Sequence, residues 1–161
     1  GQHSTSPPRA VGGNMDIRQL TAGATLFLPV AVSGALFSVG DAHAAQGDGE
    51  VCGTAIEMDA TVTFRFDLLK GQSIPGPRFR TRQAEPVTGE WYAAAASNAD
   101  LYDASRLALR GILDYLEAEH ALTRTEACLL ASVCVDLRIS QIVNAATFTV
   151  TAFLPLAIFT A

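Results

Sequence analysis

The sequence predicts a β-rich α+β fold, in which strands of a sandwich or barrel precede a helical hairpin and a final strand. Three observations carry this prediction. Alternating, threonine-rich segments with frequent turns fill the chain before residue 98, and such segments are typical of sandwiches and barrels. Apolar residues then recur at helical spacing between residues 98 and 134. Alternation returns between residues 147 and 154, where it predicts one last strand.

The start of the chain differs from the rest. Residues 1–13 are rich in Ser, Pro and Gly and predict a linker or a truncated edge, whereas residues 14–161 carry the patterns of a folded domain. The sequence has no initiator Met and begins without a folding signal, as a cut inside a longer protein would. We therefore expect the chain to be a portion of a larger protein.

An uncharged run covers residues 19–40, and a run of this length could cross a membrane. Proline, glycine and threonine residues interrupt it, so two strands joined by a turn at Ser33–Gly34 explain it better. The first strand covers residues 26–32, where Pro29 favours a sheet edge or a bulge. The second covers residues 35–39.

Four further stretches show strand patterns. Residues 50–57 form an apolar run after a glycine-rich loop, and residues 78–82 and 90–95 are also expected to be strands. Residues 60–68 alternate apolar and polar side chains, which predicts a half-buried strand. The apolar side chains of that alternation are Val62, Phe64, Phe66 and Leu68.

The helical hairpin follows. Asn98 can cap a first helix, whose apolar stripe recurs at helical spacing. The stripe consists of Ala108, Leu109, Ile112, Leu113 and Leu116. Thr123 and Glu126 form the sequence of a capping box, which opens a second helix. The buried face of that helix is Ala127, Leu130, Ala131 and Cys134. The last strand, residues 147–154, stops at Pro155.

The composition limits the partners of the chain. Of its 161 residues 49% are hydrophobic and only 17% are charged, a low charged fraction for a free-standing surface. Part of the surface is therefore expected to be covered by a missing half or a neighbouring subunit. The net charge of −5 argues against nucleic-acid binding. The basic cluster Arg78, Arg80 and Arg82 lies on one face of a strand and is interpreted as solvated or partner-facing.

The cysteines favour a reducing compartment. Cys52, Cys128 and Cys134 have neither disulfide-framework nor zinc-knuckle spacing, and free thiols are typical of the cytoplasm. A nucleophilic role for Cys52 is the alternative to a buried, inert thiol. The inert thiol is favoured, because Cys52 lies in an apolar stretch far in sequence from Lys70, the only lysine.

The polar residues between 41 and 50 are the candidate site. Asp41 and His43 are two residues apart, so both side chains can reach one ion from an extended loop. Imidazole nitrogen and carboxylate oxygen suit zinc, while the oxygen ligands of this stretch also allow calcium. A site needs at least one more ligand. The alternative interpretation is that His43 only hydrogen-bonds Asp41 in a turn.

The neighbouring segment could supply acid–base groups. Gln46, Asp48 and Glu50 alternate with glycines, and two carboxylates in one loop can provide a general base for water and an acid for a departing amine. The alternative is an ordinary acidic turn, since Asp-Gly is a common turn dipeptide. The spacing of an EF-hand calcium loop is absent.

A resemblance accompanies these residues. Residues 40–50 (GDAHAAQGDGE), together with Gly-Gly-Asn-Met-Asp at 12–16, resemble the acetamidase/formamidase family. Pro-Pro-Arg at 7–9, Asp136–Gln141 and the Leu-Pro ending at 154–155 fit the same family. The resemblance implies a metal-dependent hydrolase of linear amides, of which this chain is the C-terminal portion. It also implies that Asn14 and Asp16 lie near the substrate. Asp136 and Arg138 are interpreted as a structural ion pair after the second helix.

Two functional hypotheses follow. In the first, the protein hydrolyses the carbon–nitrogen bond of a short amide such as formamide or acetamide and releases ammonia. His43 and Asp41 hold the metal, Glu50 activates water, and Asp48 or Gln46 orients the amide. In the second, the chain is inactive alone, as a fragment or as a subunit of a homo-oligomer. A pure binding module is a weaker third hypothesis.

Overall fold

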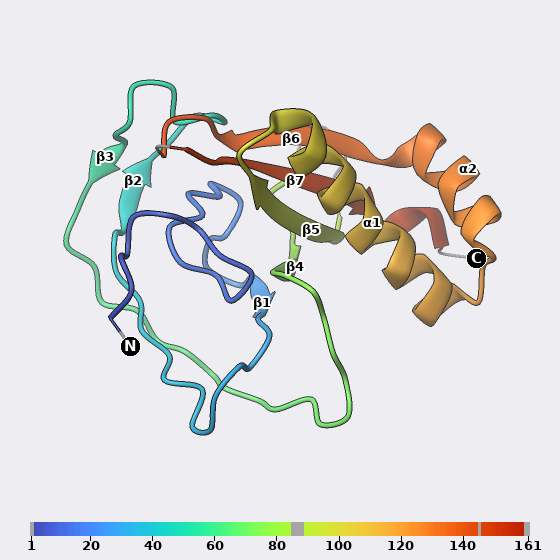
Figure 1. The fold of residues 1–161 in the computed structure, drawn as a ribbon, viewed down its shortest axis with the longest axis horizontal. Coiled ribbons are helices and arrows are strands. Elements are labelled where there is room, and N and C mark those ends of the chain that lie inside the picture. The colour runs from blue at the N-terminus through green and yellow to red at the C-terminus, as the bar shows by residue number, and fades with distance from the viewer. Residues whose placement is uncertain (1, 85–88, 145, 160–161) are drawn as a thin grey trace.

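The computed structural model describes residues 2–84, 89–144 and 146–159. Its strands and helices follow one another as shown in Figure 1. In chain order they are β1 (Thr25–Phe27), β2 (His43–Ala45), β3 (Ile56–Glu57), β4 (Arg78–Thr81), β5 (Trp91–Asn98), α1 (Leu101–His120), α2 (Arg124–Cys134), β6 (Asp136–Gln141), β7 (Phe148–Pro155) and the 3-10 turn η1 (Leu156–Phe159).

The strands form one large sheet and one small ribbon. The sheet has the order β1-β4-β5-β7-β6 and its neighbouring strands are all antiparallel. The ribbon pairs β2 with β3 and is set apart from the helices (Figure 1). The expected α+β class is confirmed, with the helical pair and the final strand in place. Where a sandwich or barrel was expected, the described residues form this sheet and ribbon.

Helix α1 covers one face of the sheet, across β5 and β7 (Figure 1). Its predicted stripe is confirmed at Ala108, Ile112 and Leu116, which are fully buried. Asp100, not Asn98, is the N-cap residue, because its side chain accepts from the backbone N–H of Asp103. The expected capping box of α2 is present. It supplies hydrogen-bond acceptors for N–H groups at the start of the helix, which have no partner within the helix.

The opposite face of the sheet is covered by the segment at residues 14–20. Met15 and Ile17 pack there against Trp91 and the odd-numbered alanines of β5, while the even-numbered residues of β5 face the helices. Both faces of β5 are therefore buried, which explains its nearly continuous apolar sequence. Asp16 lies between Met15 and Ile17 but is not part of this core; its backbone carbonyl accepts from Gln46 of the ribbon side and its carboxylate accepts from Asn144.

Three predicted strands are wrong among the described residues. Residues 35–39 and 60–68 are exposed and unpaired in any sheet, and of residues 50–57 only Ile56–Glu57 forms a strand. Alternation predicts a strand only where a neighbour supplies the hydrogen bonds, and these stretches have no such neighbour in the described chain. The turn at Ser33–Gly34 is present. The strand expected at residues 26–32 is confirmed only as the edge strand β1 (Thr25–Phe27), and Pro29 lies beyond its end.

Other expectations need correction. Arg78 is 9% exposed and pairs with Asp114 of α1 at 3.4 Å, so it is neither solvated nor free for a partner. Cys52 is exposed rather than buried. Asp136 and Arg138, expected to pair with each other after α2, both lie in β6, and Arg138 Nη1 is 3.5 Å from Asp48 Oδ2. Among the described residues, no helix combines the length and apolarity needed to span a bilayer.

Gly111 sets the distance between α1 and the sheet. A Cβ atom at this position would lie 2.7 Å from Cβ of Ala94, and Ala94 is fixed in β5 with 2% exposure. We expect Gly111→Ala to lower the free energy of unfolding by about 1–3 kcal/mol, as overpacked cores do, despite the higher helix propensity of Ala. Urea titration followed by circular dichroism measures this change.

The matched control for this substitution is Gly40→Ala. Gly40 has open space around its Cβ direction and no positive φ, so its free energy of unfolding is expected to change by less than about 0.5 kcal/mol. Equal effects of the two substitutions would contradict the packing argument.

Candidate metal-binding active site

The β2–β3 ribbon brings three candidate ligands together. His43 lies opposite Glu57 in the register of the ribbon, and Asp41 precedes β2 in a left-handed backbone conformation with φ 64°. His43 Nε2 is 3.3 Å from Asp41 Oδ1 and 3.3 Å from Glu57 Oε2. The three ligand atoms all lie within 4.8 Å of one another. Of the three residues, sequence reasoning predicted two and missed Glu57.

The orientation of the His43 ring is fixed by Gln46. Gln46 Nε2 donates to the backbone carbonyl of Asp16 at 2.6 Å, which assigns Gln46 Oε1 to the contact of 2.9 Å with His43 Nδ1. Because a carbonyl oxygen only accepts, Nδ1 carries the proton. Nε2 is then the ring atom whose lone pair faces Asp41 and Glu57, and this is the tautomer of a metal-ligating histidine.

Nε2 of His43 has no hydrogen-bond partner among the described residues. It is buried, and neither carboxylate contact has hydrogen-bond geometry. The hydrogen bond to Gln46 raises the pKa of His43, burial lowers it, and the carboxylates of Asp41 and Glu57 raise it further. Two carboxylates around Nε2 favour positive charge at that point, which either a protonated ring or a bound cation supplies. One nitrogen and two oxygens are a donor set that zinc accepts, so the residues fit a divalent ion.

Glu50 is a buried carboxyl group close to this cluster. It is 8% exposed and its backbone has φ 43°, a conformation that Glu rarely adopts. Burial raises the pKa of Glu50, and the charge of Asp16 and a side-chain hydrogen bond with Asp16 raise it further, while the nearby His43 lowers it. A carboxyl group whose pKa is raised by burial is a stronger base than an exposed one, which suits it to accept a proton.

Asp16 is held in place from the far end of the chain. Asn144 Nδ2 donates to the Asp16 carboxylate, and Asn144 itself is positioned by Gln141, whose Oε1 accepts from the Asn144 backbone N–H at 3.0 Å. Gln141 is fully buried and donates through Nε2 to Thr149 Oγ1 at 2.9 Å. This chain of hydrogen bonds connects the sheet to the site.

Asp48 has a different environment from the other carboxylates. Its Oδ1 accepts from Gln19 Nε2 at 3.0 Å and lies 3.5 Å from Arg18 Nε. Its Oδ2 lies 3.5 Å from Arg138 of β6. The next residue, Gly49, is bridged to Gln141, so the loop is attached to the edge of the sheet. Asp48 thus connects its own loop to residues 18–19 and to β6, and it does not face the ligand cluster.

Asn14 contacts the site only through its backbone. Its carbonyl oxygen accepts from Asn144 Nδ2 at 3.4 Å, whereas its side-chain Nδ2 donates to the carbonyl of Ser6 at 2.9 Å. The structure therefore brings Asp16, Asp41, His43, Gln46 and Glu50 together. It places Asp48 and the Asn14 side chain beside them, with other partners.

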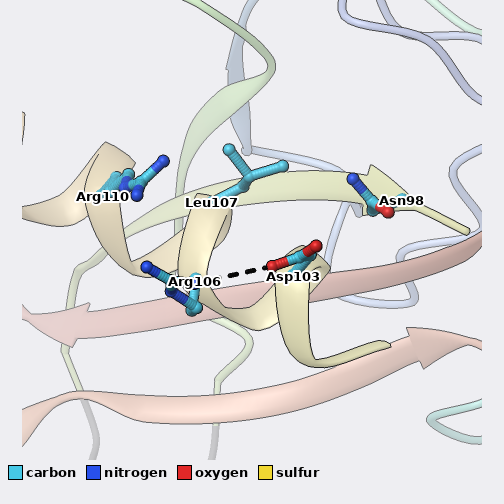
Figure 2. A pocket seen from close by; sticks show the side chains of 5 residues that line it. All are labelled: Asn98, Asp103, Arg106, Leu107 and Arg110. Atoms are coloured by element: carbon cyan, nitrogen blue, oxygen red, sulfur yellow. Dashed lines mark ion pairs between the residues drawn. The ribbon is translucent and has the colours of Figure 1, made fainter. Parts of the chain in front are cut away.

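An open depression of about 400 Å³ adjoins the ligand cluster. Asp41, Glu57, Met58 and Asp59 line it, so two of the three candidate ligands face space that a small molecule can enter. A second depression of about 210 Å³ lies along α1 and is lined by Asn98, Asp103, Arg106, Leu107 and Arg110 (Figure 2). Arg106 there forms an exposed 3.7 Å ion pair with Asp103, an ordinary pair within a helix.

The chain can now be compared with known proteins. The model of the acetamidase/formamidase family matches residues 2–161. The chain belongs to the acetamidase/formamidase family. It is 42% identical to an acetamidase of Mycolicibacterium smegmatis over 103 residues, which are 60% of this chain and 25% of the relative. It is 31% identical over 170 aligned residues to a formamidase of Methylophilus methylotrophus, covering 96% of this chain and 42% of the relative.

Solved acetamidase structures share the fold. The crystal structure from Yersinia enterocolitica aligns with a TM-score of 0.88 at 33% identity and covers 98% of this chain and 45% of that one. The structure from Bacillus halodurans aligns with a TM-score of 0.86 at 35% identity, covering 96% of this chain and 50% of that one. The chain thus spans half or less of the length of these family members.

Sequence reasoning missed Glu57, Gln141 and Asn144. Glu57 was placed at the end of an expected strand, and only the cross-strand register identifies it as the partner of His43. A hairpin interpretation of the apolar segments on either side of the glycine-rich loop could have indicated that pairing. Gln141 stands in a motif that carried the resemblance, but no residue pattern showed that it supports Asn144.

The raised pKa of Glu50 predicts a pH dependence of stability. The unfolded chain releases this proton at lower pH than the folded chain, so the Glu50 charge lowers the stability of the folded state as the pH rises through that interval. We expect metal-free Glu50→Gln protein to melt at a higher temperature than the parent at pH 7.5. The two melting temperatures should converge at pH 4. Scanning calorimetry with EDTA measures both.

The control for this prediction is Glu119→Gln, an exposed carboxylate on α1. Its effect on the melting temperature is expected to be small at both pH values. A Glu50→Gln protein that is less stable than the parent at pH 7.5 would show that burial does not penalise this carboxylate.

Proposed function

We propose that Asp41, His43 and Glu57 hold a divalent metal ion in a site that hydrolyses the carbon–nitrogen bond of a short linear amide. The observation that carries this proposal is the buried Nε2 of His43, held 3.3 Å from each of two carboxylate oxygens. The nitrogen ligand favours zinc over calcium, which prefers oxygen ligands only. Bound there, the ion would act as a Lewis acid that polarises a carbonyl and lowers the pKa of water.

Glu50 is the proposed base. Hydrolysis adds water across the amide, so one proton must leave the attacking water and one must reach the departing nitrogen before ammonia separates from the carboxylate product. A buried carboxyl group with a raised pKa can take the first proton and pass it to the nitrogen. Asp16, hydrogen-bonded to Glu50 and Asn144, holds that carboxyl group in position.

The remaining predicted site residues receive positioning roles in this proposal. Both ends of the Gln46 amide are engaged, one by His43 and one by Asp16, so Gln46 orients the ligand ring rather than the substrate. Asp48 holds the loop through Arg18 and Arg138. Asn14 shapes the site through its backbone carbonyl.

The substrate class comes from the relatives. An acetamidase and a formamidase are among the proteins that this chain resembles, and formamide and acetamide are small and uncharged. The open depression beside Asp41 and Glu57 is large enough for either. The three free cysteines and the acidic net charge fit a cytoplasmic enzyme that binds no nucleic acid.

Metal binding tests the ligand assignment without any activity measurement. The purified chain is dialysed against zinc and its metal content is measured by plasma mass spectrometry. We expect about one zinc per chain, and at least a tenfold loss of affinity in His43→Ala and in Glu57→Gln. Asp59→Asn is the matched control, because Asp59 lines the same depression but does not contact His43. Equal zinc content in all four proteins would refute the site.

Ammonia release tests the reaction. The chain is assayed with formamide and acetamide, with and without a chelator. Activity should require metal, and Glu50→Gln should lower kcat by about 10²-fold or more, as expected for a lost general base, while zinc content stays unchanged. Activity that survives both the chelator and Glu50→Gln would remove the mechanism. Zinc binding without ammonia release would support the alternative that this chain alone is inactive.

A further inference from the structure

Two extended segments leave the ribbon and carry about half of the large exposed apolar side chains among the described residues. The first arm is residues 29–40, which lead toward β2, and the second arm is residues 58–70, which follow β3 (Figure 1). Every residue from 30 to 41 and from 56 to 73 is exposed. The largest apolar side chains on the arms are Val30, Val32, Leu36, Phe37, Val39, Met58, Val62, Phe64, Phe66, Leu68 and Leu69.

The arms contact each other but belong to no sheet. Phe37 packs edge-on against Phe64 and Phe66, with ring centroids 5.2 and 5.1 Å apart. Between residues 59 and 67 no backbone group is hydrogen-bonded to the backbone of another described residue. The exposed backbone groups of this segment are free to pair with another strand. The exposed aromatic rings gathered beside them mark an interaction surface.

The alternation in the second arm indicates the kind of partner that it fits. Val62, Phe64 and Phe66 alternate with Thr61, Thr63 and Arg65, a period of two that suits a strand with one buried and one solvated face. An apolar-faced extended segment of this kind pairs with a free sheet edge. The occupant is therefore a β-rich polypeptide that offers a strand edge and an apolar face.

The solved acetamidase chains are about twice as long as this chain. The alignments to the two crystal structures cover 98% and 96% of this chain, with TM-scores of 0.88 and 0.86, so they extend through both arms. This chain matches 45% and 50% of those chains, so each contains about as much again of the same fold outside the matched region. That remaining part of the fold is the candidate partner for the arms.

We propose that the two arms are the docking surface for the part of the acetamidase fold that this chain does not match. The Phe37–Phe64–Phe66 cluster is the centre of the contact, and the second arm adds as a strand to the partner's sheet. Because the arms continue directly into the strands that carry His43 and Glu57, docking also fixes the ribbon. The inference stands on the fold and is independent of the reaction proposed above.

Co-expression tests this proposal. The probe is the affinity-tagged segment of the Bacillus halodurans acetamidase that lies outside its alignment with this chain. We expect the tagged segment to retain this chain at a 1:1 ratio and hydrogen exchange of residues 58–70 to slow at least tenfold in the complex. Phe64→Ser combined with Phe66→Ser should lower the retained amount at least tenfold. These residues are exposed, so the substitutions leave the core of the chain intact.

The matched control is Leu129→Ser combined with Val133→Ser, a more exposed apolar pair on α2, which should leave retention unchanged. The matching segment of the Bacillus protein itself is the positive control for the tagged probe. Retention of that segment but not of this chain would overturn the proposal. So would a complex in which the arms still exchange freely, or a homodimer of this chain alone that already protects them.

Discussion

The hydrogen bond between His43 and Gln46 is the interaction on which the candidate site depends. It decides which ring nitrogen carries a proton, and thereby which one is left to face Asp41 and Glu57. Without this bond the ring could turn or change tautomer, and Nε2 would no longer be held toward the two carboxylates. Gln46 can do this because its other end is fixed to the backbone of Asp16, so the ring orientation is set by the N-terminal segment.

The position of Asp16 depends in turn on hydrogen bonds in the centre of the sheet. The hydroxyl groups of Thr149 and Thr151 lie on the buried strand β7 and bond Gln141 and Ser140 of β6. These fully buried polar side chains are satisfied by one another, which is the condition under which a polar group is tolerated in a core. Through Asn144 they hold Asp16, and with it the surroundings of Glu50. The site segment around Asp16 is in this way attached to the sheet.

Much of the fold could be predicted from the sequence, for a physical reason. The helices and strands β5 and β7 are covered on the sides that their patterns indicate, so the apolar periodicity of α1 and the capping box of α2 describe contacts made within the chain. The alternation at residues 60–68 predicted a strand that is not paired in the structure, because no described strand lies beside it. His43 and Asp41 could be identified by residue type, whereas Glu57 needed the register of the ribbon.

The bridge from Asp48 to Arg138 has a consequence for the order in which the protein folds. The glycine-rich loop is anchored to β6 at Gln141 and Arg138, about ninety residues later in the chain. Contacts over such separations form late, because they must overcome the loop-closure entropy of everything between them. A nascent chain that has emerged only as far as α2 contains the glycine-rich loop but not the β6 residues that anchor it. The glycine-rich loop is therefore anchored only after the C-terminal strand β6 has formed.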